Sequence, residues 1–210
     1  MKILIIGASG GTGKELVRQA LEQGHEVAAF VRQPRRLTLS HPRLSLIQGD
    51  VLDPVSVGNA VRGKDAVLCA LGHKRWFIKT SILSRGTKNI VASMEQHGVE
   101  RLLCETSLGV GDSWGRLGLY YTLFVQPVIV FFYFRDKGLQ EKIIRSSRLK
   151  YTIVRPGQLT NGAKRGTYKH GPNLGNWIIT PRISRADVAD FMLKQLTDPS
   201  YERATVAVTY

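Results

Sequence analysis

The feature that most constrains the fold of this chain is a glycine-rich turn between an apolar run and an amphipathic segment. Residues 2–6 read Lys-Ile-Leu-Ile-Ile, which predicts a strand buried on both faces. Residues 13–23 carry apolar side chains at helical spacing. The turn between them, residues 7–13, reads Gly-Ala-Ser-Gly-Gly-Thr-Gly. Its glycines allow a sharp turn, close approach of the backbone to a pyrophosphate and tight helix–strand packing, so the unit predicts a dinucleotide site.

The start of the predicted helix supplies the donors for that site. Free N–H groups and the positive end of the helix dipole attract phosphate, and the hydroxyls of Ser9 and Thr12 add two further donors. The turn residues expected to contact the cofactor are Gly7, Ser9, Gly10, Gly11, Thr12 and Gly13.

The end of the second strand, residues 26–32, indicates which dinucleotide is bound. An NAD site places a carboxylate there for the ribose 2′-hydroxyl. This chain has Arg32, Arg35 and Arg36 and no nearby carboxylate. Guanidinium groups pair with a 2′-phosphate in a bidentate way, so we expect NADP(H) bound by Arg32 and Arg36. At least one of the three arginines is expected to be an ordinary solvated side chain.

The rest of the chain continues to alternate strands with helices. This pattern predicts an α/β fold, a Rossmann-type doubly wound parallel sheet forming one domain over residues 1–210, with a small C-terminal substrate lobe after Gly157. Ser184 is expected to cap the last helix, with Asp187 completing a capping-box-like pair. Further strands are predicted at 44–48, 66–70, 101–106, 151–155 and 205–208. Further helices are predicted at 54–61, 82–97 and 131–147, and the last helix is predicted to run from the Ser184 cap to residue 196.

Two more strand ends add to the predicted crevice. Asp50 and Val51 follow the third strand, where Asp50 could accept a hydrogen bond from the adenine amino group. Leu71 and Gly72 follow the fourth strand and would lie against the middle of the cofactor. Because the carboxyl ends of parallel strands share one edge, we expect all four residues to line the cofactor site.

Composition limits the partners and the compartment. The net charge of +14 favours anionic partners. No nucleic-acid recognition motif accompanies it, so no specific nucleic acid is expected. Cys69 and Cys104 lie in apolar runs and are expected to be core residues, and no metal-ligand spacing occurs. The first apolar run is too short for a signal peptide, which favours a cytoplasmic protein. Peripheral contact with the inner membrane face is an open alternative.

Four stretches together resemble a known family. The glycine turn, the Gly-Asp-Val step at 49–51, the Thr-Ile-Val-Arg-Pro-Gly stretch at 152–157 and the Ile-Ser-Arg-Ala-Asp-Val-Ala stretch at 183–189 look like the atypical short-chain dehydrogenase/reductases. Biliverdin-IXβ reductase/flavin reductase-like and NmrA-like proteins are the most similar groups. The resemblance implies a one-domain Rossmann fold, NADP(H), and contact of the nicotinamide half with Ser107, Pro156 and Gly157. Biliverdin reductases carry a histidine near the position of Gln158, so a bilin substrate is in doubt.

The candidate catalytic residues are Ser107, Tyr133 and Lys137. Many short-chain reductases use these three residue types, with the tyrosine and lysine one helical turn apart. The lysine would bond the ribose and lower the tyrosine pKa, which makes the tyrosine a general acid. A core or interface role for Tyr133 is an equal alternative, because it ends an apolar run. In that case a solvent proton would complete the reaction.

The apolar stretch from Leu119 to Phe134 does not fit an ordinary small reductase. It is interpreted either as a buried helix under a lid or as a lipophilic wall of the substrate pocket, a dimer contact or a membrane-touching patch. We expect the basic residues before and after it to border such a patch: His73, Lys74, Arg75, Lys79, Lys142, Arg145, Arg148 and Lys150.

The residues together favour an NADPH-dependent reductase that transfers hydride to a small conjugated acceptor, a quinone, flavin or carbonyl compound. An aromatic or lipophilic substrate suits such a pocket. The alternative is a non-catalytic NADP(H)-binding redox sensor or assembly factor. The oligomeric state is not predicted.

Overall fold

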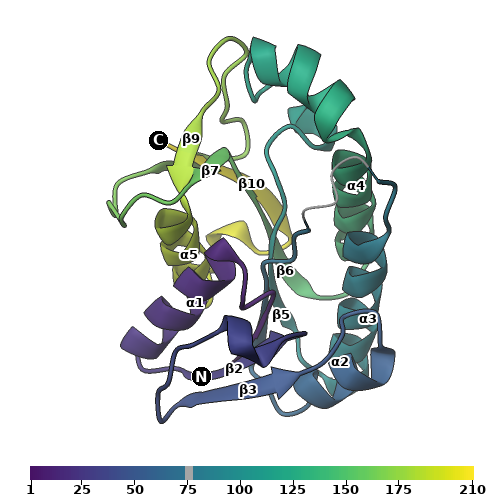
Figure 1. Ribbon diagram of the computed structural model, residues 1–210, viewed down its shortest axis with the longest axis vertical. Helices are drawn as coiled ribbons and strands as arrows, with labels where there is room; N and C mark the ends of the chain where they lie inside the picture. Colours follow the sequence, from purple (N-terminus) through teal and green to yellow (C-terminus); the bar gives the residue numbers. More distant parts are fainter. Residues whose placement is uncertain (74–77) are drawn as a thin grey trace.

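The computed structural model describes residues 1–73 and 78–210, and they form the predicted doubly wound α/β domain (Figure 1). The main sheet has eight strands in the order β3-β2-β1-β4-β5-β6-β10-β8. All neighbours pair in parallel except β8, which runs antiparallel to β10. The strands are β1 (Lys2–Ile6), β2 (Glu26–Val31), β3 (Leu44–Gln48), β4 (Ala66–Cys69), β5 (Arg101–Glu105), β6 (Lys150–Pro156), β8 (Lys169–Gly171) and β10 (Ala204–Thr209).

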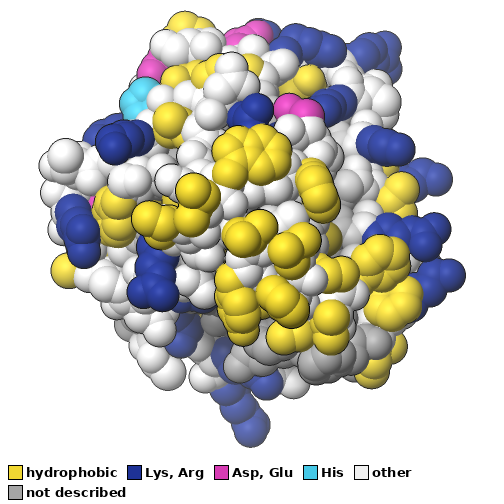
Figure 2. All heavy atoms as spheres, turned by 90° about the horizontal axis from the view of Figure 1, so that it is seen from above, with side chains coloured by type: hydrophobic (Ala, Val, Ile, Leu, Met, Phe, Trp, Pro, Cys, Tyr) yellow, Lys and Arg dark blue, Asp and Glu magenta, His cyan; other side chains and the backbone are white. Residues whose placement is uncertain are grey.

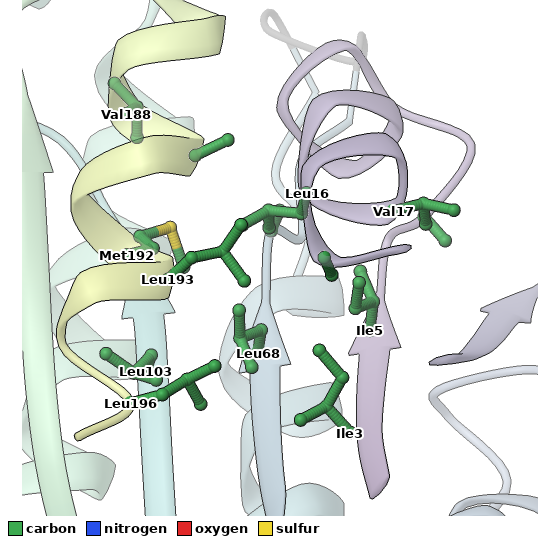
Figure 3. Packing of buried hydrophobic residues seen from close by; sticks show 14 of the residues in the cluster. Ile3, Ile5, Leu16, Val17, Leu68, Leu103, Val188, Met192, Leu193 and Leu196 are labelled. Carbon is green, nitrogen blue, oxygen red and sulfur yellow. The ribbon is translucent and has the colours of Figure 1, made fainter. Parts of the chain in front are cut away.

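Helices cover both faces of the sheet, as a parallel sheet requires. In Figure 1, α1 (Gly11–Glu22) and α5 (Arg185–Lys194) lie on one face. The other face carries α2 (Pro54–Val61), α3 (Ile82–His97) and α4 (Phe131–Arg145). Successive residues of β1 alternate between the two layers, so Ile3 and Ile5 join the core beneath α1 and α5. Figure 3 shows this core, where Leu16 meets Leu193 above Leu68.

The order of the strands fixes the place of the cofactor crevice. The chain builds β1 to β3 in one direction and then returns to the other side of β1 to build β4 to β6. The connections after β1 and β4 therefore diverge, and ligands of such sheets bind at the carboxyl ends of the strands beside this switch point. The glycine turn and the residues after β4 lie there.

The small C-terminal lobe after Gly157 is confirmed, and it ends before α5. Strands β7 (Gln158–Thr160) and β9 (Arg182–Ser184) pair in a separate two-stranded sheet. Helix α5 then packs on α1, and β10 returns to the main sheet. The lobe therefore comprises only residues 158–184.

One of the two hydrogen bonds of the capping box predicted for α5 is confirmed. The Ser184 Oγ accepts a hydrogen bond from the Asp187 backbone N–H at 3.0 Å. The reciprocal bond of a capping box does not form, because the Ser184 N–H donates to the Tyr210 hydroxyl at 3.1 Å. The Asp187 carboxylate instead accepts from the Ser184 hydroxyl at 2.8 Å.

The apolar stretch before α4 departs most from expectation. Residues 121–129 form a π-helix, η3 (Tyr121–Ile129), and a buried helix beneath a lid is wrong, since Phe124 is 60% exposed and Val128 is 70% exposed. The basic residues Lys142 to Lys150 do not border it. They lie at the far end of α4 or beyond: at the α-helical rise Lys142 is about 12 Å and Arg145 about 17 Å along the axis from Phe134. Of the other expected neighbours, Lys79 is exposed and His73 half-buried, whereas Lys74 and Arg75 lie outside the described residues.

Both cysteines are free and buried on neighbouring strands, as expected of core residues. None of the helices in residues 1–73 and 78–210 is long and apolar enough to cross a bilayer.

Candidate cofactor and active site

The glycine turn is held by contacts that only glycine permits. Gly7 has a φ of 81°, in the left-handed region, and its carbonyl accepts a hydrogen bond from the Gly10 N–H at 2.9 Å. A Cβ on Gly7 would lie 2.4 Å from the Ala70 oxygen, and a Cβ on Gly13 would lie 2.1 Å from the Gly7 oxygen. The turn therefore packs α1 directly against the ends of β1 and β4.

The start of α1 is suited to bind an anion. The helix begins at Gly11, two residues earlier than predicted, and its first turn holds no acidic residue. Gly10 is the N-cap, and no side chain in the described part of the chain bonds to this end. Gly10 and Gly11 are exposed and Ser9 is half-buried. Backbone N–H groups and the helix dipole thus face the crevice, where they favour phosphate.

Thr12 differs from its expected role. Its side chain is buried, and its hydroxyl donates to the Glu105 Oε1 at 2.9 Å. The hydroxyl therefore ties the glycine turn to the end of β5, and the Thr12 backbone N–H remains for a phosphate. Burial raises the pKa of Glu105 above its ordinary value, while Lys137 and the Thr12 hydroxyl oppose that rise.

Lys137 lies on the other side of Glu105. Its Nζ donates to the Glu105 backbone oxygen at 3.0 Å and to the Leu71 backbone oxygen at 3.4 Å. Burial lowers the pKa of Lys137, but Tyr133 and Glu105 outweigh this and hold the pKa above its ordinary value. The ammonium is therefore charged at neutral pH, and it bridges the ends of β4 and β5.

Tyr133 and Lys137 lie one turn apart on α4, as their spacing predicts. The Lys137 Nζ is 5.5 Å from the centre of the Tyr133 ring. The Tyr133 hydroxyl would be 3.5 Å from a Cβ on Gly72, and its ring packs edge-on to His73 at 4.9 Å. Tyr133 is half-buried: it faces the end of β4 and also packs against the buried apolar cluster that contains Leu108 and Phe134.

Ser107 lies at the end of the neighbouring strand β5. It is half-buried, and its hydroxyl donates to the Leu108 backbone oxygen at 2.9 Å. Because β4 and β5 pair in parallel, Ser107 and Gly72 share the carboxyl edge of the sheet. The structure thus brings all three candidate catalytic residues to one edge.

The carboxyl end of β2 carries the predicted cations. Arg32 directly follows β2, and a single 3-10 turn, η1 (Pro34–Arg36), presents Arg35 and Arg36. All three arginines are exposed. A 2′-phosphate at this strand end would meet guanidinium groups and no carboxylate from β2.

The residues after β3 divide between crevice and core. Asp50 is exposed, and its Oδ1 accepts from the Leu52 N–H at 2.9 Å, which fixes a short turn. The Val51 side chain is buried, and a Cβ on Gly86 would lie 2.8 Å from it. Val51 therefore packs between the sheet and α3, and only its backbone lies at the strand end.

Pro156 and Gly157 are both buried beneath the C-terminal lobe. A Cβ on Gly157 would lie 2.6 Å from the Pro181 backbone oxygen, so this glycine lets the lobe approach the end of β6. Gln158 is exposed, and its Oε1 accepts from the Arg182 Nε at 3.0 Å. This bond therefore holds β7 against β9 within the lobe.

Arg185 is a candidate site residue that the sequence pattern did not indicate. It is the first residue of α5, and its side chain crosses the glycine turn. A Cβ on Gly11 would lie 2.5 Å from the Arg185 Cδ. Its Nη1 donates to the Asn161 Oδ1 at 2.6 Å. The available signal was its position directly after the Ser184 cap, at a helix start in an α/β sheet.

No cluster of three or more His, Cys, Asp or Glu side chains that could hold a metal ion occurs in residues 1–73 and 78–210. A hollow of about 480 Å³ is lined by Lys64, Glu100 and Lys150 at the amino edge of the sheet. It lies opposite the candidate residues, so we do not assign it to the cofactor.

Comparison with known proteins agrees with this geometry. The sequence family described as NAD(P)H-binding matches residues 7–199. An uncharacterized chloroplast protein of Arabidopsis thaliana is 31% identical over 93% of this chain and 71% of its own length. The photosystem II assembly factor Ycf39 of Synechocystis is 24% identical, and the match covers 99% of this chain but only 62% of that factor. The anaerobillin reductase ChuY from Escherichia coli O157:H7 superposes with a TM-score of 0.82 at 25% identity, over 100% of this chain and 97% of that one.

Proposed function

This chain belongs to the NAD(P)H-binding family, and from that premise we propose that it is an NADPH-dependent reductase acting on a small conjugated acceptor. The acceptor would be a quinone, a flavin or a related carbonyl compound. One observation carries the proposal: Thr12, Glu105, Lys137 and Tyr133 connect the glycine turn to a half-buried phenol through successive contacts.

The preference for NADPH over NADH is supported by charge. The exposed arginines at the end of β2 would neutralise a 2′-phosphate, which carries charge that NADH lacks. Arg185 would add a second cation beside the pyrophosphate, because its side chain lies against Gly11. We therefore propose that Arg32, Arg36 and Arg185 hold the phosphates of the cofactor.

The chemistry would divide between cofactor and protein. The reduced nicotinamide supplies the hydride. Tyr133 would donate a proton to the acceptor, to the carbonyl oxygen of a quinone or carbonyl compound or to a ring nitrogen of a flavin, and the charged Lys137 beside it would stabilise the phenolate that remains. Ser107 would orient the acceptor oxygen from the end of β5. The Lys137 Nζ already donates to two backbone oxygens, which hold the ammonium beside the Tyr133 ring. We therefore assign Lys137 an electrostatic role on Tyr133 in addition to contact with the ribose.

A turnover assay tests this proposal. The purified protein is supplied with NADPH or NADH and a panel of quinones, flavins and carbonyl compounds, and oxidation is followed by absorbance. We expect oxidation of NADPH with at least one class of acceptor and slower oxidation of NADH. Tight NADPH binding in calorimetry without turnover on any acceptor would contradict the reductase.

That contradicting result would support a second function, a non-catalytic NADP(H)-binding redox sensor or assembly factor. The similarity to Ycf39 over 99% of this chain favours it. In that case reduced and oxidised cofactor should bind with different affinities, because a sensor must distinguish the two.

A further inference from the structure

An exposed apolar surface covers the end of the molecule above the C-terminal lobe and α4. Two segments form it, residues 119–131 and residues 177–179, and we call it the apolar face. Six of its side chains are at least 60% exposed: Tyr120, Phe124, Val128, Trp177, Ile178 and Ile179. Figure 2 shows apolar side chains gathered over this end of the molecule. Single exposed apolar residues are ordinary, whereas a contiguous group of this kind marks a binding surface.

The two segments are built against each other. The Leu119 N–H donates to the Ile178 backbone oxygen at 3.2 Å. A Cβ on Gly115 would lie 2.2 Å from the Trp177 ring, so that ring packs on the turn that leads to residue 119. The Asn176 Oδ1 accepts the N–H groups of residues 178 and 179, each at 2.8 Å. This turn is therefore fixed with three large apolar side chains at its tip.

The charged residues that bound the two segments of the apolar face in the sequence are all basic. Residues 117–134 and 171–181 contain no charged side chain. On leaving each uncharged stretch in either direction along the sequence, the first charged residue is a Lys or Arg. These residues are Arg116 and Arg135 for the first stretch, and Lys169 and Arg182 for the second. Figure 2 shows Lys and Arg side chains around the apolar face and few acidic ones. An apolar centre with a basic border is complementary to an anionic lipid surface.

We propose that the apolar face docks this protein on the surface of an anionic lipid bilayer. Helix η3 would lie in the plane of the interface, and the tip at residues 177–179 would enter the boundary between headgroups and acyl chains. The basic residues at the segment ends would contact the headgroups. Neither segment is a spanning helix, so the protein would rest on one leaflet.

Co-sedimentation with vesicles tests the docking. The full-length protein is mixed with phosphatidylcholine vesicles or with mixed phosphatidylglycerol–phosphatidylcholine vesicles, in dilute and in concentrated NaCl. We expect binding to the mixed vesicles that weakens with salt and little binding to phosphatidylcholine alone. The variant Ile178→Ser/Ile179→Ser should bind at least about tenfold more weakly, because two large side chains no longer leave water.

Matched variants separate the docking from general effects. Val55→Ser removes an equally exposed apolar side chain from α2 and should bind like the parent protein. Arg135→Glu/Lys169→Glu should lose affinity for the mixed vesicles only. Unchanged NADPH affinity in all variants checks the fold and keeps this test independent of the proposed reductase. Absence of parent binding in dilute salt, or equal binding by Ile178→Ser/Ile179→Ser, would overturn the proposal. So would a parent dimer that the same variant converts to a monomer without any vesicle binding.

Discussion

Arg185 and Glu105 reach the glycine turn from different parts of the chain. Arg185 crosses the turn at Gly11, and Glu105 accepts the Thr12 hydroxyl across a sequence separation of 93 residues. Local spacing predicts Tyr133 and Lys137, because one helix carries both. It gives no sign of Glu105, since a carboxyl at the end of an apolar strand also fits a solvated position. The partners of Glu105 depend on which strands are neighbours in the sheet, and a pattern of residues along the sequence does not give that order.

Arg32 should decide between the two nicotinamide cofactors. Arg32→Ala is expected to weaken NADPH binding by about 1.5–3 kcal/mol, the range for a hydrogen bond to a charged group, and to leave NADH binding unchanged. Isothermal titration calorimetry measures both affinities. Arg62→Ala, an exposed arginine after α2, is the matched control. Equal affinity of the parent protein for NADPH and NADH would contradict the assignment.

Tyr133→Phe should lower kcat by about 100-fold or more and leave the NADPH dissociation constant unchanged, because only the transferred proton is removed. Steady-state kinetics with the best acceptor measure this change. Tyr120→Phe removes an exposed hydroxyl outside the crevice and serves as the control. Full turnover by Tyr133→Phe would mean that solvent supplies the proton and that this tyrosine is structural.

Asp187 anchors the C-terminal lobe through four hydrogen bonds. The cost to the free energy of unfolding of replacing Asp187 should depend on pH. Burial raises the pKa of Asp187, but donors from Tyr210, Gly166, Ser184 and Arg165 outweigh this and hold it below its ordinary value. The resulting stabilisation is present above the unfolded-state pKa of about 4 and is lost as pH falls through the folded-state value.

Asp187→Asn should therefore lower the free energy of unfolding by about 2–4 kcal/mol near neutral pH. The gap to the parent protein in the free energy of unfolding should narrow at acidic pH, below the unfolded-state pKa of about 4. Urea denaturation at both values measures it, with the exposed Glu202→Gln as control. A gap independent of pH would show that the carboxylate charge does not stabilise the lobe.

At the scale of elements, apolar strands and amphipathic helices were predictable and short polar elements were not. β3, α2 and α3 have the predicted bounds, because their apolar spacing and end residues agree. Strands β7, β8 and β9 have three residues each, too few for a period to show. The prediction for helix η3 was wrong for another reason. A continuous apolar run has the same pattern whether it is buried by the domain or left on its surface.

The packing of α1 on β1 gives a prediction for this element pair. Gly13→Ala places a methyl 2.1 Å from the Gly7 oxygen, so the turn must open. We expect a loss of about 1–3 kcal/mol in the free energy of unfolding, together with weaker NADPH binding. Gly58→Ala in α2 is the matched control, since its nearest neighbour would be 3.7 Å away. It should stabilise by about 0.5–1 kcal/mol. Equal effects of the two substitutions in urea denaturation would contradict close packing at Gly13.

At the scale of the whole molecule, the crevice and the apolar face share the carboxyl end of the sheet. Phe131 of the apolar face and Tyr133 of the candidate site lie on the first turn of α4. A molecule docked as proposed would hold its phenol close to the bilayer, where lipophilic acceptors dissolve. The charge of +14 then has two uses, since cations serve both cofactor phosphates and lipid headgroups.

The position of β10 has a consequence for synthesis on the ribosome. Strand β8 is made first, yet in the main sheet it pairs only with β10, which itself pairs with β6. Once residues 169–171 have left the exit tunnel, they therefore have no strand of the main sheet to pair with until residues 204–209 have also left it. Strands β1 to β6 can associate before then, since each finds its neighbours among residues already made. The half with the glycine turn can thus form during translation, while the lobe waits for its anchoring strand.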